Sequence, residues 1–435
     1  MKLVVQVEVV DKIKPSSPTP PHLRRHDLSF LDQIANPCFM PFILFYHNDG
    51  LTTLEHKLAR IKGSLSKALR IFYLLAGKVK MDQVHVDCND SGVHYVEARA
   101  SCRLSEVLKD PEPELLKPLV PFELYDIGDM AAAVQVTSFG CGGLVLCICV
   151  SHKVGDALSC ISFLNCWAAV SCEDMDCESF VPDFGSAKLF PSIKLPEQGM
   201  EALCPIFKEG LVTKRFVFGP SSISTLRDKY SDPERGLRPS RVEALRAFFL
   251  KRHMETMRRT KYALVEAVNL RQRTTPRLSF RHFGNIIVIL KNMMELADVG
   301  EREIVSRVRE LIRDVDKECV KQIQDAYEYL KLEAEIVKET HKRGMLPIVF
   351  TSLCRFPMYE VDMGWGKPAW VSTVGLPHSD MVSFWDAKDG KSIEVYVTLK
   401  VDDMAKFEKD KELLSYISSS SAANANICNG KNKES

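Results

Sequence analysis

The fold is decided by one stretch in the first half of the chain, Leu144-Val-Leu-Cys-Ile-Cys-Val-Ser-His-Lys-Val-Gly-Asp156. Its unbroken apolar and β-branched beginning predicts a strand that is buried on both faces. Apolar residues then recur at three-residue steps from Leu158 to Trp167, which predicts a helix with one buried stripe. We therefore expect His152 at the carboxyl end of an interior strand and Asp156 at the N-cap of the helix. Polar side chains at such a junction usually face a crevice.

The spacing of His152 and Asp156 allows two interpretations. A neutral imidazole is the side chain best suited to accept a proton near pH 7, and a carboxylate four positions on can fix the ring or hold the turn. Alternatively, Asp156 is only a helix N-cap, worth about 1 kcal/mol, and His152 is an ordinary histidine at a strand end. The motif alone leaves both interpretations open.

Length and charge favour a globular protein that binds small molecules. The 435 residues suggest two or three domains, and the 46% hydrophobic and 26% charged content is typical of a globular chain. The 58 basic residues nearly balance the 57 acidic ones, so no global field attracts nucleic acid or an anionic membrane. We expect neither partner, and we expect the ligands to bind in a pocket.

The cysteines favour a reducing compartment. All 14 are scattered, largely through apolar segments, and no Cys-x-x-Cys pair occurs. This pattern predicts free thiols in the cytoplasm rather than disulfides, and it offers no metal site. The N-terminal residues 1–10 predict a strand rather than a signal peptide, and no window approaches the 18 apolar residues of a membrane helix.

Strands and helices alternate along the chain, which predicts an α/β protein. The expected strands cover residues 3–10, 41–46, 84–88, 93–97, 133–137, 144–150, 214–218, 262–268, 286–290, 346–352 and 393–399, and the expected helices cover 51–75, 157–170, 242–257, 301–339 and 402–417. Turn residues predict hairpins joining 84–88 to 93–97 and 133–137 to 144–150. Ser240 and Glu243 form a capping box that opens the helix after it, although exposed N–H groups there could also bind a phosphate.

A second motif, Asp362-Met-Gly-Trp-Gly366, follows near the C-terminus. In this order, His152-Lys-Val-Gly-Asp156 and the second motif resemble the paired signatures His-x-x-x-Asp and Asp-Phe-Gly-Trp-Gly of the plant BAHD acyltransferases. Leu28-Ser-Phe-Leu-Asp-Gln33 and Val268-Asn-Leu-Arg271 are similar to the vinorine synthase-like group of this family, which includes alkaloid O-acetyltransferases. The resemblance covers nearly the whole chain.

The resemblance implies two domains related to chloramphenicol acetyltransferase, each a mixed sheet with flanking helices, and an active-site channel at their interface. The expected domains cover residues 1–180 and 213–417, with a crossover linker at 181–212 that is rich in proline. Residues 418–435 are expected to form a disordered tail. A monomer is expected.

The mechanism implied by the resemblance centres on His152. This residue removes the proton of an acceptor hydroxyl while the oxygen attacks the thioester of acyl-CoA, expected to be acetyl-CoA, in a ternary complex without a bound cofactor. By resemblance, Asp156 faces away from the substrate and pairs with Arg271, or alternatively with Arg273.

The second motif is implied to be structural. Gly364, Trp365 and Gly366 predict a tight, packed turn in which Asp362 bonds its own loop. The alternative role for Asp362 is a second proton acceptor. Met363 replaces the phenylalanine of the family, and a flexible apolar side chain should be tolerated there.

Another departure from the family affects the chemistry. Many relatives carry Thr-Ser-Trp where this chain has Thr351-Ser-Leu353, so an indole N–H near the reacting carbonyl is absent. Losing one such donor can cost roughly 10²–10³-fold in rate. Thr351 is a candidate donor, and Ser240 and Asn285 are candidate CoA contacts. An N-acyltransferase with an amine acceptor, or a weakly active metabolite-binding homologue, are the alternative functions.

Overall fold

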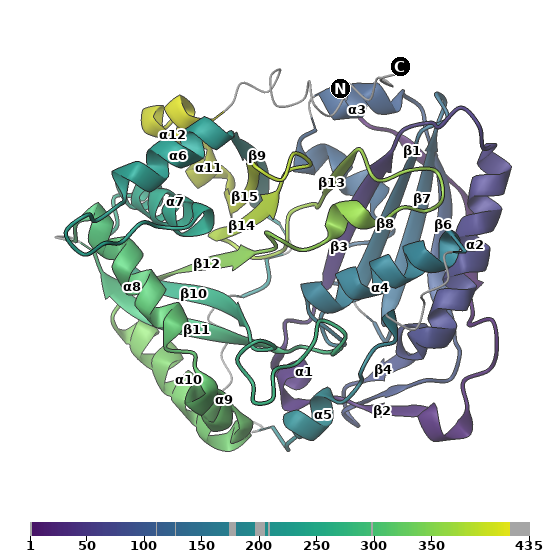
Figure 1. Cartoon of the computed structure of the whole chain (residues 1–435), viewed down its shortest axis with the longest axis horizontal. Coiled ribbons are helices and arrows are strands. Elements are labelled where there is room, and N and C mark those ends of the chain that lie inside the picture. The colour runs from purple at the N-terminus through teal and green to yellow at the C-terminus, as the bar shows by residue number, and fades with distance from the viewer. Residues whose placement is uncertain are drawn as a thin grey trace.

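The protein forms two six-stranded mixed sheets and one small sheet, with helices packed around them (Figure 1). The computed structural model describes residues 2–109, 111–126, 128–173, 180–195, 205–207, 209–296 and 299–417. The prediction of a mixed α/β fold is confirmed. The expected tail at 418–435 and much of the expected linker lie outside the described residues.

The first sheet contains the interior strand that was predicted before His152. Its strand order is β1 (Val5–Ile13), β6 (Val93–Ala100), β7 (Ala132–Phe139), β8 (Leu144–Ser151), β3 (Phe39–Tyr46) and β13 (Trp370–Ser372). Every residue of β8 is buried, because the strand lies between β7 and β3 and both faces of the sheet are covered. The predicted hairpin of β7 and β8 is confirmed.

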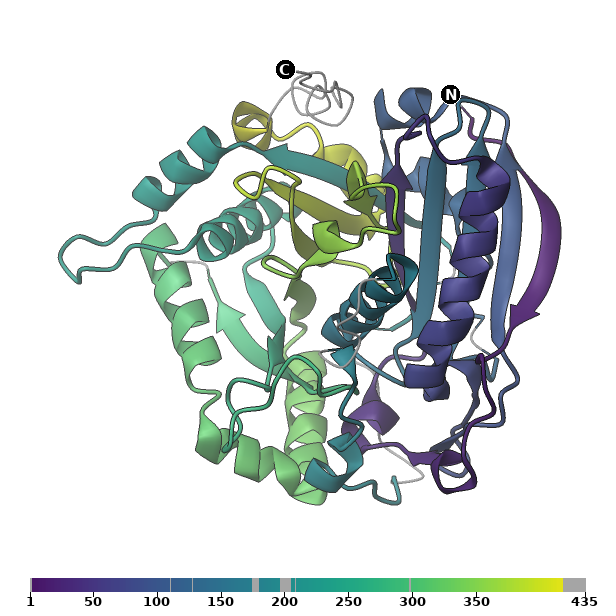
Figure 2. The same cartoon turned by 45° about the vertical axis from the view of Figure 1, so that its right-hand side comes forward.

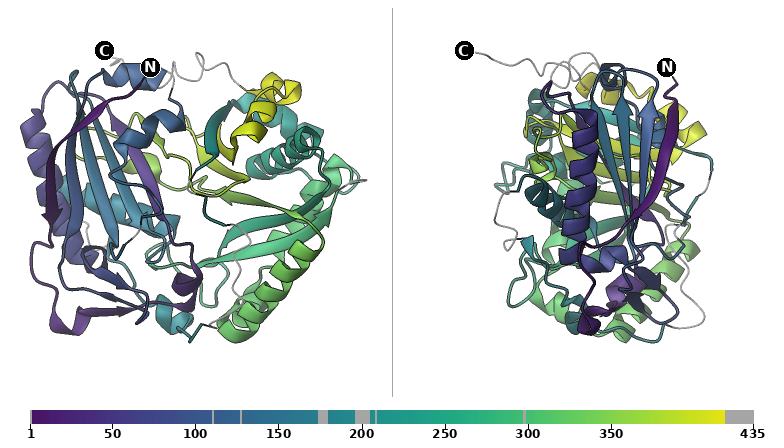
Figure 3. Two further views of the ribbon diagram at one scale, coloured as in Figure 1. Left: turned by 180° about the vertical axis from the view of Figure 1, so that it is seen from behind. Right: turned by 90° about the vertical axis from the view of Figure 1, so that its right-hand side faces the viewer.

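Two helices cover the face of the first sheet on which the even-numbered β8 residues lie. They are α2 (Leu54–Ile71), which runs in front of the strands in Figure 2, and α4 (Ala157–Ser171), which crosses in front of them in Figure 1. Leu146 and Ile148 of β8 share a core with Leu65 of α2 and Ile161 of α4. The view from behind shows the opposite face, where α3 (Leu104–Lys109) lies at one end (Figure 3).

The second sheet has three parallel strands at its centre. Its order is β11 (Ile287–Glu295), β10 (Lys261–Asn269), β12 (Leu346–Ser352), β14 (Met381–Asp386), β15 (Ile393–Lys400) and β9 (Leu211–Phe218), of which β10, β12 and β14 are parallel. One face packs against α6 (Pro220–Lys229), α7 (Arg241–Met257), α8 (Glu301–Arg313) and α11 (Val401–Phe407). Val337 of α10 (Ala326–Lys342) packs against the other face at Val265. The remaining helices are α1 (Phe30–Ile34), α5 (Ser186–Leu189), α9 (Lys317–Gln324) and α12 (Lys411–Tyr416).

One sequence-based expectation needs correction. The expected hairpin of 84–88 with 93–97 is wrong, because β5 (His85–Asp87) pairs with β2 (Arg25–Asp27) and β4 (Lys78–Lys80) in the small sheet. Within the expected C-terminal range, 213–417, β13 pairs with β3 of the first sheet, whereas the strands of the second sheet also lie largely in this range. The second half of the chain therefore contributes one edge strand, β13, to the first sheet.

Candidate active site

His152 lies in the turn that joins β8 to α4. Its backbone N–H donates to the Cys38 carbonyl at 2.9 Å, which continues the ladder between β8 and β3 by one residue. His152 as a residue is partly exposed, whereas the residues on either side of it, Ser151 and Lys153, are buried. At the end of this strand, His152 is thus accessible between two buried neighbours.

Asn285 holds the backbone of this turn from the other half of the chain. Its Nδ2 donates to the His152 carbonyl at 2.7 Å and to Oδ1 of Asp32 at 2.8 Å. The Asn285 side chain is 1% exposed, which does not suit the CoA contact expected from the sequence. Its Oδ1 and the His152 Nδ1 are both buried, and neither completes a hydrogen bond of normal geometry within the described part of the chain.

Burial lowers the pKa of the His152 imidazole. Its own backbone, the Asp156 carboxylate and the Asn285 side chain each raise that pKa, but together they offset only part of the effect of burial. The ring therefore stays neutral to a lower pH than an ordinary histidine. A neutral ring is the form that can accept a proton.

Asp156 and Arg271 form a buried bidentate ion pair between the two halves. The guanidinium donates to the two carboxylate oxygens at 2.7 and 3.1 Å, and the two side chains are 1% and 4% exposed. Burial alone raises the pKa of the Asp156 carboxyl, but the charge and hydrogen bonds of Arg271, with those of Ser159, outweigh it and hold the pKa below its usual value. Ser159 N–H also donates to Asp156, which is therefore the N-cap of α4 as predicted.

The same pair anchors the loop that leads into β11. Arg271 donates to the carbonyls of His282 and Gly284, and Ile286 N–H donates to Asp156. The alternative partner is excluded by its position, because the Arg273 guanidinium donates to the Ile312 and Val315 carbonyls. Asp156 thus points into a structural network, as the family resemblance implied.

Two further residues of this network did not emerge from the sequence analysis. Asp32 is the N3 residue of the capping box whose N-cap is Ser29 at the start of α1, and its Oδ1 accepts from the backbone N–H and the side-chain amide of Asn285. Lys153 is 8% exposed and donates to the Gln33 carbonyl at 2.8 Å. Burial lowers its pKa to about 8 against the opposing effects of Asp32 and the Cys38 thiol. In the sequence, the Ser29-x-x-Asp32 pattern could have predicted the capping box that contains Asp32.

Asp362 lies at the far end of α4 from His152. Its Oδ1 accepts the N–H groups of Gly364 and Gly366 at 2.8 and 2.9 Å, and Met363 O accepts from Ser171 at the end of α4. Because α4 has 15 residues, its two ends are about 20 Å apart. This distance does not suit a second proton acceptor. The hydrogen bonds of Asp362 instead close the turn, and Trp365 of this turn packs against Tyr46.

Thr351 lies near the carboxyl end of the central strand β12, and Leu353 follows directly after the strand. Thr351 is partly exposed, and Leu353 is 7% exposed within the core cluster that also contains Trp385. Ser240 lies elsewhere, as the exposed N-cap of α7, and its capping box with Glu243 is confirmed. Its role as a CoA contact remains a prediction.

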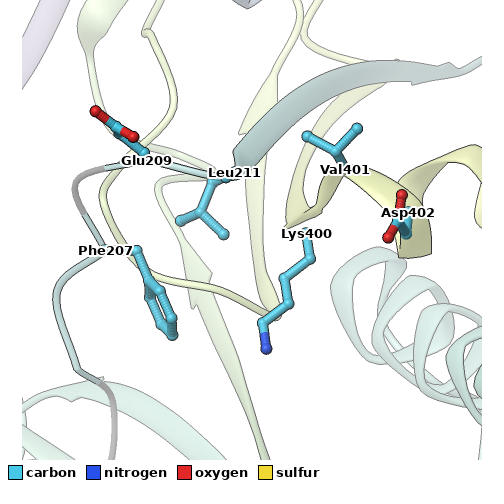
Figure 4. A pocket seen from close by; sticks show the side chains of 7 residues that line it. Phe207, Glu209, Leu211, Lys400, Val401 and Asp402 are labelled. Carbon is cyan, nitrogen blue, oxygen red and sulfur yellow. The ribbon is translucent and has the colours of Figure 1, made fainter.

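Two neighbouring hollows lie beside the crossover segment. One, of about 510 Å³, is lined by Phe122, Tyr125 and Leu376 among others, and it adjoins a smaller pocket at Phe207 and Lys400 (Figure 4). His152 does not line either hollow, so the expected channel to it remains a prediction. No helix in the described ranges is long and apolar enough to cross a membrane. Across the same ranges, no three or more His, Cys, Asp or Glu side chains are grouped to hold a metal ion.

Comparisons with known proteins identify the family of the chain. The Transferase family model matches residues 3–414. Epi-neemfruitin B synthase L1AT of Melia azedarach is 36% identical, with 93% of this chain and 96% of that protein covered. Stemmadenine O-acetyltransferase of Catharanthus roseus is 33% identical over the same shares of the two chains.

The solved structures give the same result for the fold. The crystal structure of vinorine synthase superposes with a TM-score of 0.82 at 32% identity and covers 96% of this chain and 99% of that one. At 16% identity, the TRI101 structure with coenzyme A and T-2 has a TM-score of 0.70 and supports the fold alone. The chain therefore belongs to the Transferase family, the BAHD acyltransferases.

Proposed function

We propose that the protein transfers an acetyl group from acetyl-CoA to a hydroxyl of a terpenoid or alkaloid, with His152 as the general base. The names of its relatives, limonoid 1-O-acetyltransferase of Citrus sinensis and stemmadenine O-acetyltransferase, support this class of acceptor. The observation that carries the chemistry is the partly exposed His152 on a turn that both halves of the chain hold in place.

The reaction follows from the position of the ring. His152 takes the proton of the acceptor hydroxyl while the oxygen attacks the thioester carbonyl, and the tetrahedral oxyanion then expels the CoA thiolate, which receives that proton. Within the described residues, Asn285 Oδ1 is a buried acceptor without another partner, and it suits the N–H of the imidazole Nδ1, which leaves Nε2 as the base. A positioned base of this kind contributes about 10²–10⁴-fold.

The supporting residues have separate roles in this proposal. Asp156 and Arg271 hold the turn, Thr351 donates a hydrogen bond to the carbonyl, and Ser240 lies on the CoA side. The protein acts as a cytoplasmic monomer without a bound cofactor. The cysteines of the described chain are free and mostly buried, which suits a reducing compartment. The expected domain ranges, 1–180 and 213–417, belong to this proposal as well.

Release of the CoA thiol with a panel of terpenoid and alkaloid alcohols and amines tests the proposal. His152→Ala should lose at least about 10²-fold in kcat. The matched control is His22→Ala, which removes an exposed histidine of the segment before β2 and should keep wild-type activity. Transfer that survives in His152→Ala contradicts the mechanism. Transfer to amines alone points to an N-acyltransferase, and no transfer with any donor contradicts the function.

A further inference from the structure

Two hydroxyl side chains stand next to each other at the edge of the second sheet where the His152 turn docks. Thr351 of β12 and Ser383 of β14 are direct partners in the parallel register. The carboxyl ends of β10, β12 and β14 meet at the same edge because these strands are parallel. Arg271 follows β10 at this edge and holds the His152 turn through Asp156.

Both hydroxyls lie on the face of the second sheet that meets the first sheet. Successive side chains of a strand point to opposite faces. Phe350 and Phe384, the neighbours of Thr351 and Ser383 along their strands, are part of the core under α7. Thr351 and Ser383 therefore lie on the face away from α7.

The residues two positions further along the strands confirm this direction. Leu353 and Trp385 belong to the core cluster of the first sheet, and the Trp385 ring lies 5.8 Å from that of Phe42 in β3, measured between centroids. Trp385 thus fills part of the space beside Leu353, the position at which relatives carry the indole. Its N–H is not free, because it donates to Ser383 Oγ at 3.1 Å.

This hydrogen bond fixes the oxygen of Ser383 and leaves its proton unused. Ser383 is 8% exposed, and within the described ranges its hydroxyl proton has no acceptor. A hydroxyl that accepts a hydrogen bond becomes a stronger donor, because successive hydrogen bonds polarise one another. The Trp385 indole thus donates to Ser383, and the Ser383 hydroxyl can in turn donate to a further acceptor.

We propose that Ser383, oriented by Trp385, donates a hydrogen bond to the thioester carbonyl oxygen of acetyl-CoA as that oxygen becomes the oxyanion. This inference rests on the proposed acetyl transfer. It supplies the donor that Leu353 lacks, and it adds to the Thr351 hydroxyl at the adjoining position. Ser383 is then a catalytic residue, and Trp385 is a positioning residue that acts through it.

Steady-state kinetics provide the first test. Ser383→Ala should lower kcat about 10²-fold, the size of effect seen when one oxyanion donor is removed, while the KM for acetyl-CoA changes less than about twofold. Ser383→Thr should restore most of the rate, and Trp385→Phe should show a smaller loss. Ser64→Ala is the matched control, because Ser64 also accepts from an indole, that of Trp167 at 2.9 Å, away from this edge. It should keep the wild-type kcat.

Infrared spectroscopy of acetyl-CoA labelled with ¹³C at the carbonyl provides a second test that needs no acceptor and no turnover. Binding to the wild type should lower the carbonyl stretching frequency, and Ser383→Ala should reverse part of that shift. An unchanged kcat in Ser383→Ala, or a carbonyl frequency equal to that of the wild type, overturns the inference. If the wild type transfers no acetyl group, the frequency shift still decides whether Ser383 contacts the carbonyl, so the two proposals fail separately.

Discussion

Removal of the Asp156 carboxylate should destabilise the protein and slow the reaction together. In Asp156→Ala, Arg271 keeps a side chain that is 1% exposed but loses both of its oxygen partners on the carboxylate. Breaking a buried ion pair by deleting one partner costs about 3–5 kcal/mol, because the remaining charge stays buried. The carbonyls of His282 and Gly284 still accept from Arg271, so we expect about 3 kcal/mol. This is a large share of a typical total of about 5–15 kcal/mol.

The expected loss of rate comes from geometry. Asp156 starts α4 immediately after the His152 turn, and it also accepts the N–H of Ile286 from the second sheet. A shift of about 1 Å in a catalytic group can cost on the order of 10²-fold. Urea unfolding gives the free energy of unfolding, and kcat is measured where both proteins remain folded. The control is Glu303→Ala, which breaks an exposed pair with Arg307 and should cost less than about 1 kcal/mol at unchanged kcat.

A double mutant separates the ion pair from its surroundings. Arg271→Met combined with Asp156→Ala removes both charges, so the loss of unfolding free energy should be smaller than the sum of the two single losses. Wild-type stability and wild-type kcat in Asp156→Ala would refute the reasoning. A strong loss of kcat without any loss of stability would instead give Asp156 a direct role in proton transfer.

Three further outcomes follow from particular contacts. Burial lowers the pKa of His152, and only the neutral ring accepts a proton, so the pH profile of kcat/KM should fall on its acid side with a midpoint below about 6.5. Asp362→Asn should leave kcat unchanged and lower the urea midpoint, since Asp362 bonds its own loop at the far end of α4. Gly284→Ala should lower both stability and kcat, because Gly284 has a φ of 130° and a Cβ there would lie 2.7 Å from Ser186 Oγ; wild-type values in unfolding and kinetic measurements would contradict this.

The sequence predicted best those elements whose environment leaves a local pattern. The strand before His152 is buried on both faces, and this produces an unbroken apolar run that few other structures require. The helix after it begins at Asp156 because an N-cap needs a short acceptor side chain. The pair of Asp156 with Arg271 came from the family resemblance, since the two residues are 115 positions apart and no local pattern joins them.

The errors arose where distant segments compete with local turn signals. Residues 89–92 have the residue types of a hairpin turn. However, β5 before them pairs with β2 and β4, and β6 after them pairs with β1 and β7. The three-residue strand β13 is too short to show a period, and its position depends on the partner β3. Asn285 could not be placed as a buried residue, because its burial is created by Asp32 and His152 from the other half.

The catalytic turn depends on both sheets, and this links assembly to activity. The first sheet supplies the His152 ring. From the second half of the chain, Asn285 donates to the His152 carbonyl, and Arg271 holds the same turn through its ion pair with Asp156. Neither half by itself contains both the ring and the groups that fix it. Loosening the contact between the sheets should therefore reduce kcat before either sheet unfolds. For the same reason, mutations at this contact should be judged by rate as well as by stability.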